Sequence, residues 1–71
     1  MTANDIKTAK NIVKTIGGYR EKNIIEKPYT VEIGSAWNSD HKCIIFISKD
    51  ADADGYCNSC EIDLVTKSIV G

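Results

Sequence analysis

Only residues 3–16 of this 71-residue chain show clear helical periodicity, and they lie at its N-terminal end. Ile6, Ala9, Val13 and Ile16 recur there at helical spacing, while lysines occupy the other side. A single amphipathic helix needs another surface on which to bury its apolar face. The remaining sequence must therefore supply that surface.

Both ends of the predicted helix carry local signals. Thr2 and Asp5 have the spacing of a capping box, and Gly17-Gly18 allows the left-handed turn that ends a helix. Residues 19–27 form a charged connector, and Pro28 fixes where the next extended segment begins. The helix is therefore predicted to span about Ala3 to Ile16.

The sequence after Pro28 is typical of strands. Residues 29–34 alternate apolar and polar side chains, and Trp37 closes this first strand. After a turn at residues 38–41, a β-branched and aromatic run from Cys43 to Ser48 predicts a second strand, and a third is expected from about Cys60 to Thr66. The order α-β-β-β predicts one α+β domain, with the N-terminal helix packed on a three-stranded antiparallel sheet.

The loop between the second and third strands has the most specific motif. Residues 50–61 match the calcium-loop pattern D-x-[DN]-x-[DN]-G-x5-E at every specified position. The ligands of such a site are Asp50, Asp52, Asp54, the Tyr56 carbonyl and Glu61, with Gly55 at the sharp turn. The flanks, however, resemble strands rather than the two helices of an EF-hand. The alternative is a solvated acidic turn held by side-chain to backbone hydrogen bonds.

Charge divides the chain into two halves. Its net charge is −1, but residues 1–28 carry +3 and residues 29–71 carry −4. The basic half has neither a glycine-rich phosphate loop nor an aromatic stacking pattern, so we expect no nucleic-acid partner. The acidic half favours a cation or a basic protein partner.

The three cysteines do not predict a metal centre. Cys57 and Cys60 have C-x-x-C spacing, and His41 with Cys43 nominally completes a zinc set. If the second and third strands pair across the acidic loop, His41 and Cys43 lie at the far end of the hairpin from Cys57. A redox pair favours the start of a helix, whereas this pair precedes a strand. We expect free or locally bridged thiols, with an oxidoreductase as the weaker alternative.

No catalytic set is predicted. His41 is the only histidine, it lies in a turn, and no nucleophile and orienting acid accompany it at a recognisable spacing. We expect a non-enzymatic protein without a cofactor, calcium being the alternative. No apolar run reaches the length of a membrane span, and the N-terminus lacks the order of a signal peptide, so a cytoplasmic chain with no membrane partner is expected, although a removed leader would leave the same sequence.

The succession of motifs resembles a known family. The amphipathic helix is followed by EKPYTVE at residues 26–32, by Trp37 and by Gly55, and the chain closes with EIDLVTKSIV at residues 61–70. This order is similar to that of small bacterial immunity proteins with a cystatin-like or nuclear-transport-factor-like fold, which run from a helix through a Lys-Pro-aromatic strand start and a Trp strand to a closing strand. The resemblance covers most of the chain from Ala9 onward.

The resemblance implies a non-enzymatic inhibitor that binds and blocks a bacterial toxin, such as a secreted toxin domain. The predicted contact surface is the acidic loop, with Asp50, Asp52, Asp54 and Tyr56, because carboxylates suit a cationic cleft and speed association. The alternative function is a calcium-binding module using the same loop and Glu61. Pairing of two copies through an open sheet edge is a further alternative to a monomer.

Overall fold

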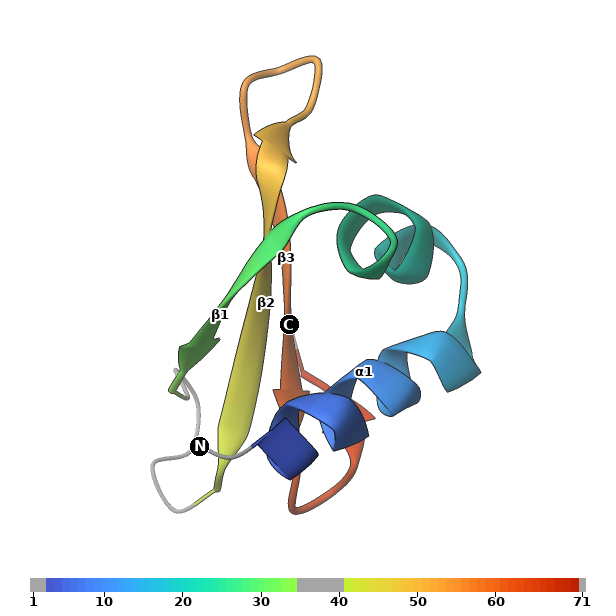
Figure 1. The fold of residues 1–71 in the computed structure, drawn as a ribbon, viewed down its shortest axis with the longest axis vertical. Coiled ribbons are helices and arrows are strands. Elements are labelled where there is room, and N and C mark those ends of the chain that lie inside the picture. Colours follow the sequence, from blue (N-terminus) through green and yellow to red (C-terminus); the bar gives the residue numbers. More distant parts are fainter. Residues whose placement is uncertain (1–2, 35–40, 71) are drawn as a thin grey trace.

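The computed structural model describes residues 3–34 and 41–70 (Figure 1). They form helix α1 (Ala3–Ile16), a short π-helix η1 (Glu21–Ile25) and strands β1 (Tyr29–Ile33), β2 (Cys43–Ala51), β3 (Cys57–Asp63) and β4 (Ser68–Ile69). The predicted α+β class, with an N-terminal helix on an antiparallel sheet, is confirmed. In the described parts of the chain, no helix is both long and apolar enough to cross a membrane.

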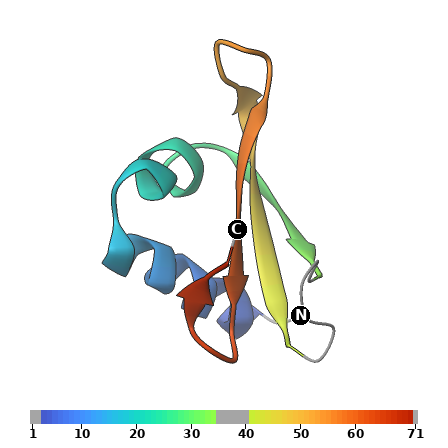
Figure 2. The ribbon, with the colours of Figure 1, turned by 180° about the vertical axis from the view of Figure 1, so that it is seen from behind.

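The sheet is a simple meander in the order β1-β2-β3-β4, and each pair of neighbours is antiparallel. Val31, Phe46 and Cys60 are aligned across its three longer strands. In both ribbon views, α1 and η1 lie on the same side of the sheet (Figures 1 and 2). The fold is therefore a two-layer arrangement, with the core between the helical layer and one sheet face.

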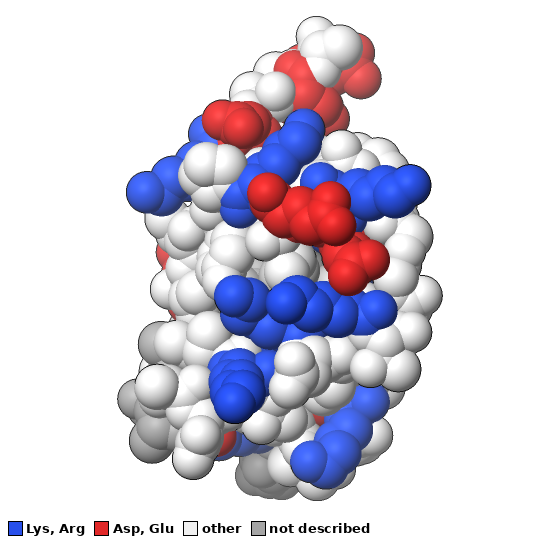
Figure 3. Space-filling view, turned by 45° about the vertical axis from the view of Figure 1, so that its right-hand side comes forward, with Lys and Arg blue, Asp and Glu red and all other residues white. Residues whose placement is uncertain are grey.

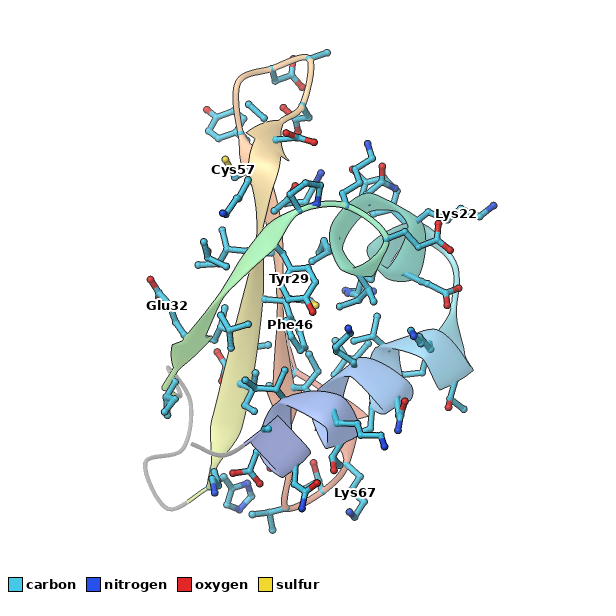
Figure 4. The ribbon with its side chains drawn as sticks, in the orientation of Figure 1. Lys22, Tyr29, Glu32, Phe46, Cys57 and Lys67 are labelled. Atoms are coloured by element: carbon cyan, nitrogen blue, oxygen red, sulfur yellow. The ribbon has the colours of Figure 1, made fainter. Side chains whose placement is uncertain are left out.

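The core is small and apolar. Its buried members are Ala9, Val13, Ile24, Ile25, Ile44, Phe46, Cys60 and Ile62. Phe46 lies among them fully buried, and the ring of Tyr29 meets it edge-on, with centroids 5.2 Å apart and an interplanar angle of 89°. Figure 4 shows these two rings on the side of the sheet that faces the helices. Aromatic pairs favour this edge-to-face geometry.

The π-helix η1 corrects the prediction of a plain connector at residues 19–27. The Glu26 N–H donates to the Glu21 carbonyl at 2.9 Å, the five-residue spacing of a π-turn. The adjacent Ile24 and Ile25 are both buried against the sheet. Pro28 follows at once and disfavours helical geometry in the residue before it, so the turn stops there. Two adjacent apolar residues have no helical period, which is why sequence periodicity missed this element.

The C-terminal part also differs from the predicted strand at Cys60 to Thr66. Strand β3 begins earlier, at Cys57, and ends at Asp63. Asp63 Oδ1 accepts hydrogen bonds from the backbone N–H groups of Val65 at 2.8 Å and Thr66 at 3.3 Å, so the chain turns there instead of continuing. The short β4 then returns alongside β3. Thr2 of the predicted capping box, Trp37, and residues 38–40 of the turn predicted at 38–41 lie outside the described residues.

Candidate functional site: an acidic hairpin arm

The ends of β2 and β3 form an arm that projects beyond the helical layer (Figure 1). The two strands pair from Cys43↔Asp63 at one end to Ala51↔Cys57 at the other. Their register shifts between Ile47 and Ala51, where the buried Ser48 hydroxyl contacts both the N–H and the carbonyl of Asp50 at 3.2 Å. Such an irregularity increases twist and redirects the end of a hairpin. We call residues 50–56 the acidic arm.

Asp52 organises the tip of the acidic arm. Its Oδ1 accepts hydrogen bonds from the backbone N–H groups of Asp54 at 2.9 Å and Tyr56 at 3.0 Å. Its backbone N–H donates to the Tyr56 carbonyl at 2.8 Å, and its carbonyl accepts from Gly55 at 3.0 Å. Gly55 has φ +87°, the left-handed region that favours glycine. The tip is thus a compact turn of the kind that aspartate stabilises through its side chain.

The remaining polar groups of the arm face solvent. Asp50 and Asp54 are exposed, and the Tyr56 side chain is 74% exposed. Figure 3 shows acidic side chains gathered at this projecting end, and lysine and arginine side chains across the face below it, with further acidic side chains among the upper ones. Three of the predicted contact residues, Asp50, Asp54 and Tyr56, are therefore available to a partner, while Asp52 serves the turn.

The calcium ligand set is not brought together. Glu61 lies opposite Ile45 in the middle of β3, four residues beyond the Ala51↔Cys57 pair, which places it about 13 Å from the arm's base at about 3.3 Å per residue. The Asp52 carboxylate and the Tyr56 carbonyl both accept backbone hydrogen bonds within the turn. These residues therefore do not fit a calcium loop in this geometry, and calcium binding stays a prediction for titration.

Glu61 instead occupies a buried position. It is 9% exposed, and its Oε2 has no hydrogen-bond partner in the described parts of the chain. Ile45 separates it from Glu32 in one cross-strand row, and Glu32 is exposed. This burial was not predicted, because the calcium-loop motif assigned Glu61 to an exposed loop as a metal ligand.

Cys57 and Cys60 are not joined by a disulfide, and the two members of the C-x-x-C pair differ in burial. Cys57 is exposed at the base of the arm, where Figure 4 labels it, whereas Cys60 is buried in the core. Burial raises the pKa of the Cys60 thiol, and the nearby Arg20 charge opposes that effect. Among residues 3–34 and 41–70, no three His, Cys, Asp or Glu side chains lie close enough to hold a metal ion.

At the opposite end of the hairpin, His41 is paired rather than simply solvated. Its Nδ1 lies 2.5 Å from Asp63 Oδ2, and Asp63 Oδ1 is held by the two backbone N–H groups of the turn. The hydrogen bond with His41 lowers the pKa of the Asp63 carboxyl, and the two backbone donors act in the same direction, against burial. Cys43 pairs with Asp63 across β2 and β3, which brings His41 close to Asp63. The contact between His41 and Asp63 was predictable only from the strand register.

Comparison of the chain with protein-family models, curated proteins and solved structures finds no match. The resemblance to immunity proteins therefore stays a prediction.

Proposed function

We propose that this protein is a non-enzymatic, immunity-type inhibitor that inserts its acidic arm into a basic cleft of a bacterial toxin domain. The observation that carries the proposal is the projection of an exposed acidic turn beyond the two-layer body (Figure 1). A narrow projecting turn suits a concave surface, and its negative charge suits a cationic one. The proposal requires no catalytic residue in this chain.

The arm has the physical properties of a binding element. The four hydrogen bonds around Asp52 hold the tip in one shape before a partner arrives, which reduces the entropy lost on binding. Tyr56 supplies a large exposed ring, and tyrosine is enriched among the residues that dominate binding energy. Asp50 and Asp54 add charge that steers a basic partner and raises its association rate.

A cross-linking experiment identifies the partner. We would replace Tyr56 with a photoreactive phenylalanine analogue and, as a matched control, replace the exposed Val65 in the turn after β3. Irradiation in the native host should yield a specific adduct with a basic protein from position 56 and not from position 65. The same adduct from both positions would contradict the arm as the contact surface.

Association kinetics with that partner then test the role of charge. The paired change Asp50→Asn and Asp54→Asn should lower the association rate constant about tenfold or more at low ionic strength, and less at high salt. The control pair Glu26→Gln and Glu32→Gln removes the same charge from exposed positions outside the arm. Equal effects of the two pairs would show that only net charge matters, and no effect of the arm pair would refute the proposal.

A further inference from the structure

A second charged surface lies on the helical layer. A groove of about 390 Å³ runs between α1 and the start of β1, and Lys7, Lys10 and Lys14 line it together with Tyr29. Lys10 Nζ lies 5.6 Å from the centroid of the Tyr29 ring, a cation-π contact that fixes one side of the groove. Lys7 and Lys14 are exposed. We call this surface the lysine groove.

The groove has positive charge without compensation. None of its lining residues is acidic, and no ion pair joins its lysines to a carboxylate within residues 3–34 and 41–70. The three lysines line one groove and are three and four residues apart on α1, which offsets their Cα atoms by about 4.5 and 6 Å along the helix axis. Like charges held this close repel one another, so an anionic occupant would lower the electrostatic free energy of the surface.

The acidic arm of the same chain has the complementary chemistry. Asp50, at the end of β2, and Asp54, in the tip, present exposed carboxylates, while the Asp52 carboxylate holds the turn. The arm also carries small side chains, Ala51 and Ala53, between its acids, which allow close approach to a groove floor that includes Ile6. Opposite charge and small flanking side chains together identify the arm as a fitting occupant.

A chain cannot place the arm in its own groove. The β2–β3 ladder continues to Ala51↔Cys57, so the arm is held as a hairpin. Figure 1 shows the hairpin pointing away from α1 along the long axis of the molecule, which extends 35 Å. The arm that enters a given groove must therefore come from a second copy.

We propose that two copies of this chain pair side by side in antiparallel orientation, each inserting its acidic arm into the lysine groove of the other. The dimer has two-fold symmetry, so the contact between arm and groove occurs twice in it, as is usual for homodimers. The pair hides both arms, so pairing competes with the binding of any basic partner. The proposal goes beyond the inhibitor function and is tested on the purified chain alone, so that either can fail independently.

Sedimentation equilibrium of the isolated chain at millimolar to micromolar concentrations is the first test. At about 10 mM salt, where the screening length is about 30 Å, the mass should rise toward twice the chain's 7.8 kDa. At about 1 M salt, where the screening length is about 3 Å, it should return to 7.8 kDa. A single-chain mass at every concentration and salt would overturn the proposal.

Charge reversal identifies the two surfaces. The arm variant Asp50→Lys with Asp54→Lys keeps Asp52, which holds the turn, and the groove variant Lys7→Glu with Lys14→Glu keeps Lys10, which packs on Tyr29. Each of these two variants should be monomeric at low salt. The two sets of changes cancel in charge, so the combined variant keeps the net charge of −1 and should pair again.

Rescue in the combined variant is decisive when compared with a control that joins the arm variant to Lys22→Glu and Lys27→Glu, exposed lysines outside the groove. This control also has a net charge of −1 but should remain a monomer, so net charge alone cannot explain the rescue. Circular dichroism of each variant, compared with the wild type, establishes that the fold is retained. A combined variant that remains a single chain would overturn the pairing of arm with groove. A dimer that survives high salt, or that persists at low salt in the arm variant alone and in the groove variant alone, would equally overturn it, and would indicate another surface such as the edge strand β1.

Discussion

Asp63 is the residue on which the lower end of the hairpin depends. One of its carboxylate oxygens contacts His41, and the other accepts from two backbone N–H groups of the turn into β4. The charged form of the carboxyl is favoured by these contacts, because each of them places a donor or a cation against it. Its pKa is accordingly lower in the folded chain than in the unfolded chain.

The lowered pKa of Asp63 determines how the stability of the fold changes with pH. A carboxyl whose pKa falls on folding contributes stability above its unfolded pKa of about 3.9, and this stability is lost as the pH falls through the lower folded value. We expect Asp63→Asn to reduce the urea midpoint at pH 7, and the difference from the wild type to shrink toward pH 2. Urea unfolding followed by circular dichroism across this range measures it.

The exposed Asp54 provides the control for this prediction, because Asp54→Asn should leave the midpoint nearly unchanged at every pH. Equal midpoints for wild type and Asp63→Asn at pH 7 would show that the His41 contact and the turn contribute nothing to stability.

Glu61 differs from Asp63, because it is a buried carboxylate whose Oε2 has no hydrogen-bond partner among residues 3–34 and 41–70. Such a group carries an uncompensated loss of hydration, and an apolar side chain of similar length removes it. We expect Glu61→Met to raise the free energy of unfolding by about 1 kcal/mol. Glu32→Met is the matched control, since Glu32 is exposed in the same cross-strand row, and it should produce no gain.

At the scale of elements, the acidic arm can be tested as a metal loop. Because Glu61 lies in the middle of β3 and Asp52 holds the turn, we expect no saturable calcium binding at micromolar concentrations. Isothermal titration, with thermal melts in calcium and in chelator, measures this. A micromolar affinity that Glu61→Gln abolishes would establish the calcium module and displace the inhibitor as the primary function.

The π-helix η1 offers a second test at this scale. Ile24 is 1% exposed and belongs to the core, so Ile24→Ala should destabilise the fold by about 2–5 kcal/mol. Lys22→Ala, on the exposed side of the same turn, should change stability by less than about 0.5 kcal/mol. Denaturant unfolding of both variants makes the comparison, and equal losses would mean that η1 does not pack on the sheet in solution.

The elements that the sequence predicted well are those whose signals are local. Periodicity and the Gly17-Gly18 stop defined α1 to the residue, and both glycines have the left-handed φ that the stop requires. The third strand was predicted to begin too late because its first three residues carry no apolar pattern: Cys57 and Ser59 are exposed, and Asn58 is half-buried. The contact between His41 and Asp63 depends on strand register, which no local pattern specifies.

At the scale of the whole molecule, charge is distributed between two parts of one fold. The sequence predicted a basic N-terminal half and an acidic C-terminal half. In the structure, lysines of the basic half line a groove on α1, and aspartates of the acidic half lie on the arm where β2 ends and β3 begins. The projection of the arm was not predictable, because it depends on β2 and β3 extending beyond the helical layer that covers the rest of the sheet (Figure 1).

The meander order of the sheet has a kinetic consequence. Every strand pairs with its neighbour in sequence and no strand pair joins residues more than 20 positions apart, so little loop-closure entropy opposes the first pairings. We expect refolding in a single phase on a timescale of about milliseconds, as is usual for small mixed domains. Stopped-flow fluorescence measures this, and a populated intermediate would contradict it. A chain that folds this quickly exposes its unpaired strands only briefly, which limits the time available for aggregation.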